Sequence, residues 1–484
     1  MKDLRAAALR GTIWSTIQQI GDRGLRAPLF LIMARLLPPE DFGLLALALT
    51  YVDFLHVLQH QGMSLALVQR EKLEPVHLNS AFWGLLVAGI GTAAVGFSTA
   101  GLFGRLTGQP DVAPIVRWLS LGLFLGAPLT LQSSLLRREL RFKSLATRSL
   151  IGQGLAGAAA IAAALAGYGV WSLVALLLVY QVAYTVLLWR ASGWRPTGGF
   201  SWARYRDLLG FGIGIMGLNV TSYLRLRADN LLVGVALGAA PLGYYSMARQ
   251  LVDGLWAFLS GSISPVLWST LARLQEAPAR LGRALHEAAE MLGLVAWPAF
   301  IGLAAVAADF VATVLGERWL PTSPLLVALA VGSIARMVAV PHLTAIAVTG
   351  RTILRLALEF LSAAATLTAL ALALPHGVLA ATWAYSAALA LVLPIQLEIG
   401  FRVLDLDRSA WLGAFGTPLL ASLVMLGAVL GLSAILGDRI IGAARLVVLI
   451  SMGCATYAAV VAATSPSLAR RLAANLKTAF RGST

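Results

Sequence analysis

Blocks of about 20 mainly apolar residues follow one another along almost the whole chain, and this pattern limits the fold more than any other feature. A helix needs about 20 such residues to cross the hydrocarbon layer of a membrane. Only 12% of the 484 residues are charged, against about 25% in an average soluble protein. A transmembrane β-barrel would instead show alternating segments of about ten residues. The sequence therefore predicts an all-α polytopic membrane protein.

Turn sequences such as "LPPEDFG", "GQPD" and "LPHG" separate the blocks into fourteen predicted transmembrane helices. The first six are expected at residues 12–34, 42–66, 80–104, 112–136, 146–167 and 170–190. The others are expected at residues 208–237, 243–272, 286–315, 321–349, 355–374, 377–400, 411–436 and 440–464. The basic N-terminus lacks a small-residue cleavage site, so the first block is expected to be a retained helix and not a signal peptide.

The basic residues lie mainly in the loops on one side of these helices. Of the 37 Lys and Arg residues, 25 lie on the side of the N-terminus, six on the opposite side and six deep within the predicted helices, when residues near a helix end are counted with the adjoining side. Because loops rich in Lys and Arg stay in the cytoplasm, both termini are expected to be cytoplasmic. The net charge of +15 then reflects orientation and contact with anionic lipids, and nucleic-acid binding is not needed to explain it.

A sequence repeat divides the chain. Residues 26–53 resemble residues 227–253, and one gap aligns Gly43 with Gly243. The copies are six helices apart and therefore have the same orientation in the membrane, as in transporters built from parallel repeats. We expect two pseudo-symmetric six-helix lobes around a central cationic cavity, followed by two extra helices and a cytoplasmic tail. These parts are residues 1–206, 207–405 and 406–484.

Charged and polar residues occur inside the predicted helices, chiefly where each repeat begins. In the first helix Asp22, Arg23 and Arg26 share one face. A charge at mid-membrane costs a few kcal/mol, so these side chains are expected to face a partner or a water-filled cavity. The cationic members of the set are Arg23, Arg26, Arg225, Arg227, Arg249 and Arg336. The acidic and polar members are Asp22, Asp53, His56, Gln59, His60, Asp229, Asn230 and Asp253.

Two interpretations stay open for any single pair, such as Arg249 with Asp253: a structural ion pair, or part of a binding site. The set as a whole favours binding, because its arginines outnumber the acids near them and a surplus of cations indicates an anionic cargo. Every cation inside a predicted helix is arginine, whereas all four lysines lie on the cytoplasmic side. The planar guanidinium group of arginine binds phosphate through two hydrogen bonds and keeps its charge.

Motifs for catalysis or cofactor binding are absent from the sequence. It contains no GxxxxGK[ST] nucleotide-binding loop and no HExxH metal motif, and its only cysteine is Cys454, which excludes a disulfide within the chain. No predicted outer loop exceeds about ten residues. A membrane glycan polymerase or ligase is expected to have a larger outer loop, so this enzymatic alternative is disfavoured. We expect no enzymatic activity, no cofactor and no metal site.

Several segments together resemble a known family. The segments "ARLLPPEDFGLLALALTYVDF", "GMSLALVQREKL", "LLRRELRFKSLATRSL", "GYGVWSLV" and "RADNLLVGVALGAAPLGYYSMARQL" resemble the Wzx-type polysaccharide flippases. These O-antigen and colanic-acid-like exporters belong to the multidrug/oligosaccharidyl-lipid/polysaccharide exporter superfamily. The resemblance covers approximately residues 10–405.

The resemblance implies that the chain flips oligosaccharide repeat units linked to undecaprenyl pyrophosphate across the bacterial inner membrane. It implies alternating access driven by H⁺ or Na⁺, and polysaccharide polymerase or export machinery as partners. It assigns Arg23, Arg26 and Arg249 to the pyrophosphate, and the surplus of cations adds Arg225, Arg227 and Arg336 as candidates. It also points to Asp229, Asn230 and Glu359 for the coupling ion. The remaining polar residues would line the cavity for the glycan.

Three other functions remain as alternatives. A multidrug exporter of the same superfamily would share the fold, but a cationic cargo calls for an acidic cavity. A lipid II flippase would also share it, although the motifs fit the polysaccharide branch better. A scaffold role does not explain charges placed in the membrane at such a cost.

The first helix gives a direct prediction. Changing Arg23 and Arg26 together to alanine is expected to abolish polysaccharide export, because the pyrophosphate would lose two of its cationic partners. Surface polysaccharide and the amount of protein in the membrane are measured together. Normal export by the double variant would contradict the assignment.

Overall fold

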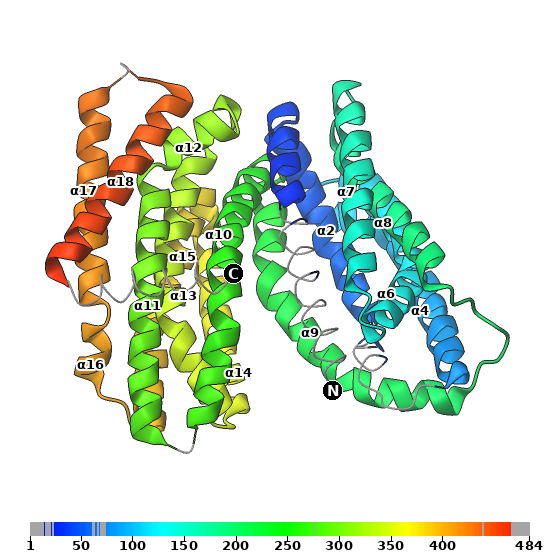
Figure 1. Cartoon of the computed structure of the whole chain (residues 1–484). Coiled ribbons are helices and arrows are strands. Elements are labelled where there is room, and N and C mark those ends of the chain that lie inside the picture. Colours follow the sequence, from blue (N-terminus) through cyan, green and yellow to red (C-terminus); the bar gives the residue numbers. More distant parts are fainter. Residues whose placement is uncertain are drawn as a thin grey trace. The chain divides into compact units, whose positions relative to one another are not determined.

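The computed structural model describes residues 24–60, 74–275, 277–437 and 440–465, together with Trp14, Gly21, Met63, Ser64 and Leu67. Within these residues the chain forms helices joined by short connections, and no strand occurs among them (Figure 1). The chain divides into two compact units, Met1–Ser246 and Met247–Thr484. The predicted all-α fold is confirmed.

The first unit consists of long helices. A helical segment at residues 24–36 comes first. It is followed by α2 (Pro39–His60), α4 (Pro75–Leu106), α5 (Val112–Gly122), the 3₁₀ turn η1 (Leu123–Leu125), α6 (Gly126–Arg138), α7 (Phe142–Leu165), α8 (Val170–Ser192) and α9 (Trp202–Leu237). Local signals set their ends. Pro75 lies in the first turn of α4 after a capping box between Glu74 and His77, and Gly193, with φ of 70°, ends α8.

The second unit begins within α10 (Ala239–Leu274), whose first turns belong to the first unit. Its other elements are α11 (Pro278–Ala305), α12 (Ala307–Val314), η2 (Glu317–Trp319), α13 (Thr322–Val348), α14 (Thr352–Ala373), η3 (Leu374–His376), α15 (Val378–Leu404), α16 (Arg408–Gly413), α17 (Gly416–Leu436) and α18 (Gly442–Thr464). Helix α13 packs against α11 and α15, and the pair α17 and α18 packs against α11 (Figure 1).

The predicted spans agree with these helices. The described part of the second predicted span lies on α2, and each later span overlaps one helix or a run of two or three consecutive helical elements. Among the described residues, 11 helical segments are long and apolar enough to cross a membrane. Helices α9 and α10 are not among them, and both carry charged residues well inside their lengths. The total of fourteen spans and the lobe boundaries at residues 206 and 405 stay predictions.

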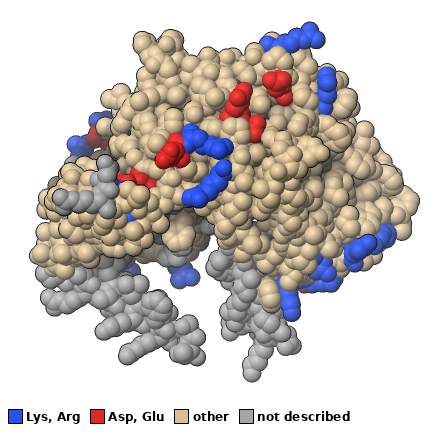
Figure 2. Space-filling model, turned by 90° about the horizontal axis from the view of Figure 1, so that it is seen from above, with Lys and Arg blue, Asp and Glu red and all other residues tan. Residues whose placement is uncertain are grey.

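The surface agrees with a membrane protein. Figure 2 shows one face of the molecule, on which most of the surface is neutral and the charged side chains gather in a few places. Large apolar side chains such as Leu372, Leu391 and Ile435 are more than 70% exposed. Contact with lipid accounts for such exposure, because acyl chains are as apolar as these side chains.

A break in the predicted fourth span is stabilised by two glutamines. The helix is interrupted by the 3₁₀ turn η1, where the backbone N–H of Gly126 donates to the carbonyl of Leu123. Gln59 of α2 donates its amide to the carbonyl of Leu123 at 2.9 Å, and Gln181 of α8 donates to that of Gly122 at 2.6 Å. Gly126 leaves room for Gln59, because a Cβ atom there would overlap its amide. The two glutamines thus tie the break to α2 and α8 through added hydrogen bonds.

The two glycines aligned by the sequence repeat lie against each other's helices. A Cβ atom on Gly43 would overlap the carbonyl oxygen of Ala239, and one on Gly243 would overlap that of Pro39. The same alignment pairs Pro39 with Ala239. In each copy of the repeat, the glycine therefore contacts the residue that stands four positions before the glycine of the other copy. The first turns of α2 and α10 therefore approach backbone to backbone, which only glycine permits at these positions.

Changing Gly43 to alanine is expected to destabilise the protein by about 2–3 kcal/mol, because a backbone carbonyl cannot rotate away from the new methyl group. The matched control is Gly91 to alanine in α4, where a Cβ atom would meet nothing within 4 Å. Thermal unfolding of both purified variants measures the difference. If the Gly43 and Gly91 variants melted at the same temperature, the close contact between α2 and α10 would contribute no measurable stability, which would contradict this prediction.

Candidate functional site

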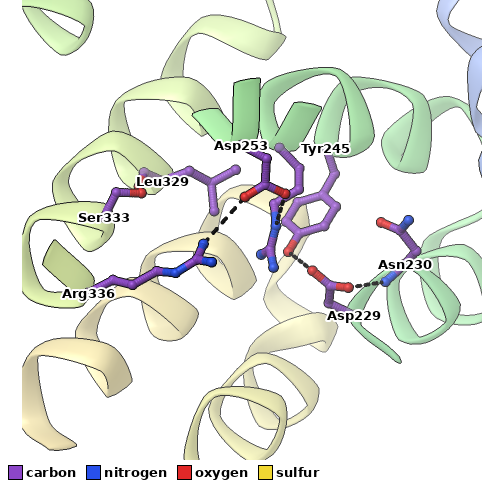
Figure 3. Close-up of polar contacts among 8 residues, drawn as sticks. Asp229, Asn230, Tyr245, Asp253, Leu329, Ser333 and Arg336 are labelled. Atoms are coloured by element: carbon purple, nitrogen blue, oxygen red, sulfur yellow. Dashed lines mark hydrogen bonds and ion pairs between the residues drawn. The ribbon is translucent and has the colours of Figure 1, made fainter. Parts of the chain in front are cut away.

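Three charged side chains from two helices meet in the second unit. Arg249 and Asp253 lie one turn apart on α10 and therefore on one face of it. Arg336 comes from α13. The Nε atom of Arg249 lies 3.3 Å from Oδ2 of Asp253, and a terminal nitrogen of Arg336 lies 3.5 Å from Oδ1 (Figure 3). One carboxylate thus contacts two guanidinium groups.

Each of these arginines also lies over an aromatic ring. The guanidinium carbon of Arg249 is 5.0 Å from the ring centre of Tyr385 on α15, and that of Arg336 is 4.0 Å from Trp256 on α10. An aromatic face attracts a cation within about 6 Å. Each guanidinium group is therefore held by an aromatic ring as well as by Asp253. Sequence analysis missed both rings: no spacing along the chain links Tyr385 to Arg249, and Trp256, although three residues after Asp253 on α10, was not singled out.

The exposure of this cluster differs among its members. The side chain of Asp253 is 47% exposed, that of Arg336 35% and that of Arg249 12%. Both arginines also have interactions beyond those with Asp253 and the rings. Two guanidinium groups at one position can attract an anion, and the most accessible member of the cluster is the carboxylate.

In the first unit Arg26 has polar and aromatic neighbours. Its Nε atom donates to the side-chain oxygen of Gln153 at 3.3 Å, and its guanidinium carbon lies 5.5 Å from the ring centre of Tyr180. Gln153 is on α7 and Tyr180 is on α8. The arginine itself is exposed. Neither neighbour was singled out from the sequence, and Asp22 and Arg23 lie outside the described residues.

Asp53 and Arg227 come together in the same unit. Asp53 is partly buried on α2, and Arg227 of α9 acts on its carboxylate electrostatically. Between the two helices Tyr223 donates a hydrogen bond to the carbonyl of Thr50. The side chain of Arg225 lies outside the described part of α9. The structure thus pairs one predicted acid with one predicted arginine.

The predicted glycan-contacting residues of α2 differ in their surroundings. His56 is partly buried and has at least one further interaction. Gln59 is 1% exposed and supports the helix break through Leu123. The side chain of His60 lies outside what the structure describes. Contact of these residues with a glycan stays a prediction.

A buried polar group joins the end of α9 to the start of α10. Asp229, Asn230 and Tyr245 are 2%, 4% and 0% exposed. The hydroxyl of Tyr245 donates to Oδ2 of Asp229 at 2.8 Å, and the backbone N–H of Asn230 donates to Oδ1 at 2.9 Å (Figure 3). The side-chain oxygen of Asn230 has no hydrogen-bond partner among the described residues. Hydrogen bonds to its oxygens stabilise the buried carboxylate of Asp229.

Glu359, the other residue considered for an ion, lies on α14. Its carboxylate pairs with Arg355 one turn earlier, at 3.0 Å. Among the described residues no group of three or more His, Cys, Asp or Glu side chains is arranged to hold a metal ion.

Solved structures identify the fold. The chain is similar to the lipid II flippase MurJ in an inward closed conformation, with a TM-score of 0.73, 15% identity, and coverage of 94% of this chain and 99% of that one. It is also similar to an inward-facing MATE family multidrug resistance transporter of the MOP superfamily, with a TM-score of 0.63, 13% identity, and coverage of 81% and 94%. The fold is therefore that of a multi-pass membrane protein of this transporter class.

Sequence comparison identifies the family. A family model described as "Polysaccharide biosynthesis protein" matches residues 32–324, and the chain belongs to this family. It is 30% identical over 319 residues to the succinoglycan biosynthesis transport protein ExoT of Rhizobium meliloti, covering 66% of this chain and 64% of ExoT. It is 28% identical over 352 residues to the lipopolysaccharide biosynthesis protein WzxC of Escherichia coli, covering 70% and 69%. The resemblance inferred from the sequence is confirmed.

Changing Tyr245 to phenylalanine is expected to lower the stability by about 1–3 kcal/mol, because the buried carboxylate of Asp229 loses a hydrogen bond. The control is Tyr168 to phenylalanine, since the side chain of Tyr168 is 63% exposed. The melting temperatures of the purified variants are compared with that of the unchanged protein. A loss of the same size in both variants would contradict this role of the Tyr245 hydroxyl.

Proposed function

We propose that the protein moves oligosaccharide repeat units linked to undecaprenyl pyrophosphate from the cytoplasmic to the outer leaflet of the bacterial inner membrane, for surface polysaccharide synthesis. Family membership supports this, since relatives are named as succinoglycan and lipopolysaccharide biosynthesis proteins. The chain spans 64% of the length of ExoT. In this proposal the protein is a secondary-active transporter with cytoplasmic termini and not an enzyme.

The shared carboxylate in the second unit carries the proposal. Arg249 and Arg336 both approach Asp253, so their guanidinium groups are close enough to contact one small anion together. Arginine binds phosphate through parallel N–H donors and stays charged when water is excluded. A pyrophosphate group, with its several anionic oxygens, is the part of the proposed substrate that this pair fits.

The other candidate residues receive roles that follow from their chemistry. Arg26 and Arg227 of the first unit, with Arg23 and Arg225, would contact the pyrophosphate at other stages of transport. The glycan would contact polar side chains such as His56, and the polyprenyl chain would stay in lipid. Asp229, Asn230 and Glu359 supply carboxylate and amide oxygens, which suit H⁺ or Na⁺ as coupling ion.

Export of organic cations is the second function that this fold supports, because a MATE family transporter shares it. The charge of the cluster opposes it. Two arginines around one aspartate repel a cation, and a cationic cargo would require the opposite balance. Extrusion of a cationic dye from cells that contain the protein is the test, and we expect none above background.

Changing Arg249 and Arg336 together to glutamine is expected to weaken binding of the pyrophosphate-bearing substrate roughly 100-fold, because two charge-assisted contacts are lost. In a strain that lacks the native protein, this variant should leave the lipid-linked oligosaccharide on the cytoplasmic face and the cell without surface polysaccharide. Leaflet distribution is measured by accessibility of the glycan to an enzyme added outside.

The matched control changes Arg402 and Arg408 together to glutamine. These arginines also share one carboxylate, that of Glu398, but they lie at the end of α15 and beyond it. Export should persist in this control. Repeat units that accumulate unpolymerised on the outer face would contradict flipping and assign the protein to the polymerase or ligase class.

A further inference from the structure

We propose that Asp253 is the resident counter-ion of the arginine site. Its carboxylate holds Arg249 and Arg336 while the site is empty, and a phosphate group of the substrate displaces it. This rests on the proposed function, because it assumes that the two arginines bind phosphate. The new element is that a carboxylate of the protein itself competes with the substrate for the two arginines.

The geometry of the carboxylate is that of a bound anion. Each of its oxygens contacts a different arginine, Oδ2 at 3.3 Å and Oδ1 at 3.5 Å. Two oxygens on one phosphorus atom can contact the same two guanidinium groups in the same way. Asp253 and a phosphate group therefore compete for one position.

The contacts of Asp253 are loose. Charge-assisted hydrogen bonds between nitrogen and oxygen are usually about 2.7–2.9 Å long, and both distances at Asp253 exceed this. By comparison, Glu398 contacts Arg402 at 2.6 Å and Arg408 at 2.7 Å. Asp253 is also the most exposed member of its cluster, at 47%. A loosely held, accessible carboxylate is easily displaced, because partly exposed ion pairs contribute little stability.

The aromatic rings keep the site assembled during this exchange. When the carboxylate leaves, Arg249 still lies over Tyr385 and Arg336 over Trp256. Cation–π attraction depends on the ring and not on the anion. The two guanidinium groups therefore keep their positions for the incoming phosphate, and on release the carboxylate can return to them.

The exchange predicts an unusual direction of effect. A carboxylate that only supports the arginines would weaken phosphate binding when it is removed. Removing a competing carboxylate would strengthen phosphate binding, because the cluster loses one negative charge and the phosphate no longer has to displace it. The sign of the change in affinity therefore separates the two roles.

The test measures binding of inorganic pyrophosphate to the full-length protein in lipid nanodiscs. The substitution Asp253→Asn is expected to lower the Kd about tenfold, the size of effect that corresponds to losing two weak ion pairs. Asp253→Ala serves as a second variant without a hydrogen-bonding amide. Glu398→Gln removes a carboxylate that also bridges two arginines, and it should leave the Kd unchanged.

Three results would overturn the proposal in distinguishable ways. An unchanged or raised Kd in both Asp253 variants, with binding still lost when Arg249 and Arg336 become glutamine, rejects the exchange and leaves the phosphate site intact. Two other outcomes would reject both the phosphate site and the exchange. In the first, neither the unchanged protein nor Asp253→Asn binds pyrophosphate. In the second, pyrophosphate still binds when Arg249 and Arg336 are both glutamine. Melting temperatures confirm that each variant is folded.

Discussion

The cost of placing a charge in hydrocarbon governs this structure. An unpaired charged side chain inside a membrane is unfavourable by at least a few kcal/mol, and no water is present to reduce that cost. The described candidate arginines accordingly have partners: Asp253 and two aromatic rings in the second unit, and Gln153, Tyr180 and Asp53 in the first. In the proposed function an anionic cargo would contact the same guanidinium groups.

The same constraint acts on the backbone. At η1 the helix breaks inside a predicted span, and Gln59 and Gln181 donate hydrogen bonds to backbone carbonyl groups at this break. Gly43 and Gly243 let two helices meet without intervening side chains, and close contact replaces the hydrophobic effect as the source of stability there. Polar side chains in the membrane thus divide into those that complete the fold and those that are left for a cargo.

Much of the fold could be predicted because apolar length is a strong signal. The span expected at 170–190 is α8, Val170–Ser192, and the one expected at 321–349 is α13, Thr322–Val348. Breaks inside the spans were not foreseen, because η1 keeps the apolar composition of its neighbours. In the site, helical spacing paired Arg249 with Asp253. It could not supply Arg336 or Tyr385 as their neighbours, since contacts between distant segments leave no period in the sequence. Trp256, three residues after Asp253 on α10, has helical spacing, but its aromatic side chain carries no charge and was not singled out.

The central claim is that an anionic lipid-linked glycan is the cargo. The most direct measurement uses the purified protein in liposomes loaded with undecaprenyl-pyrophosphate-linked oligosaccharide and an imposed ion gradient. Cleavage of the glycan by an enzyme confined to one side reports movement between leaflets. The account predicts that the protein makes the protected glycan cleavable, and that a cationic dye is not transported under the same gradient. Transport of the dye without movement of the glycan would contradict it.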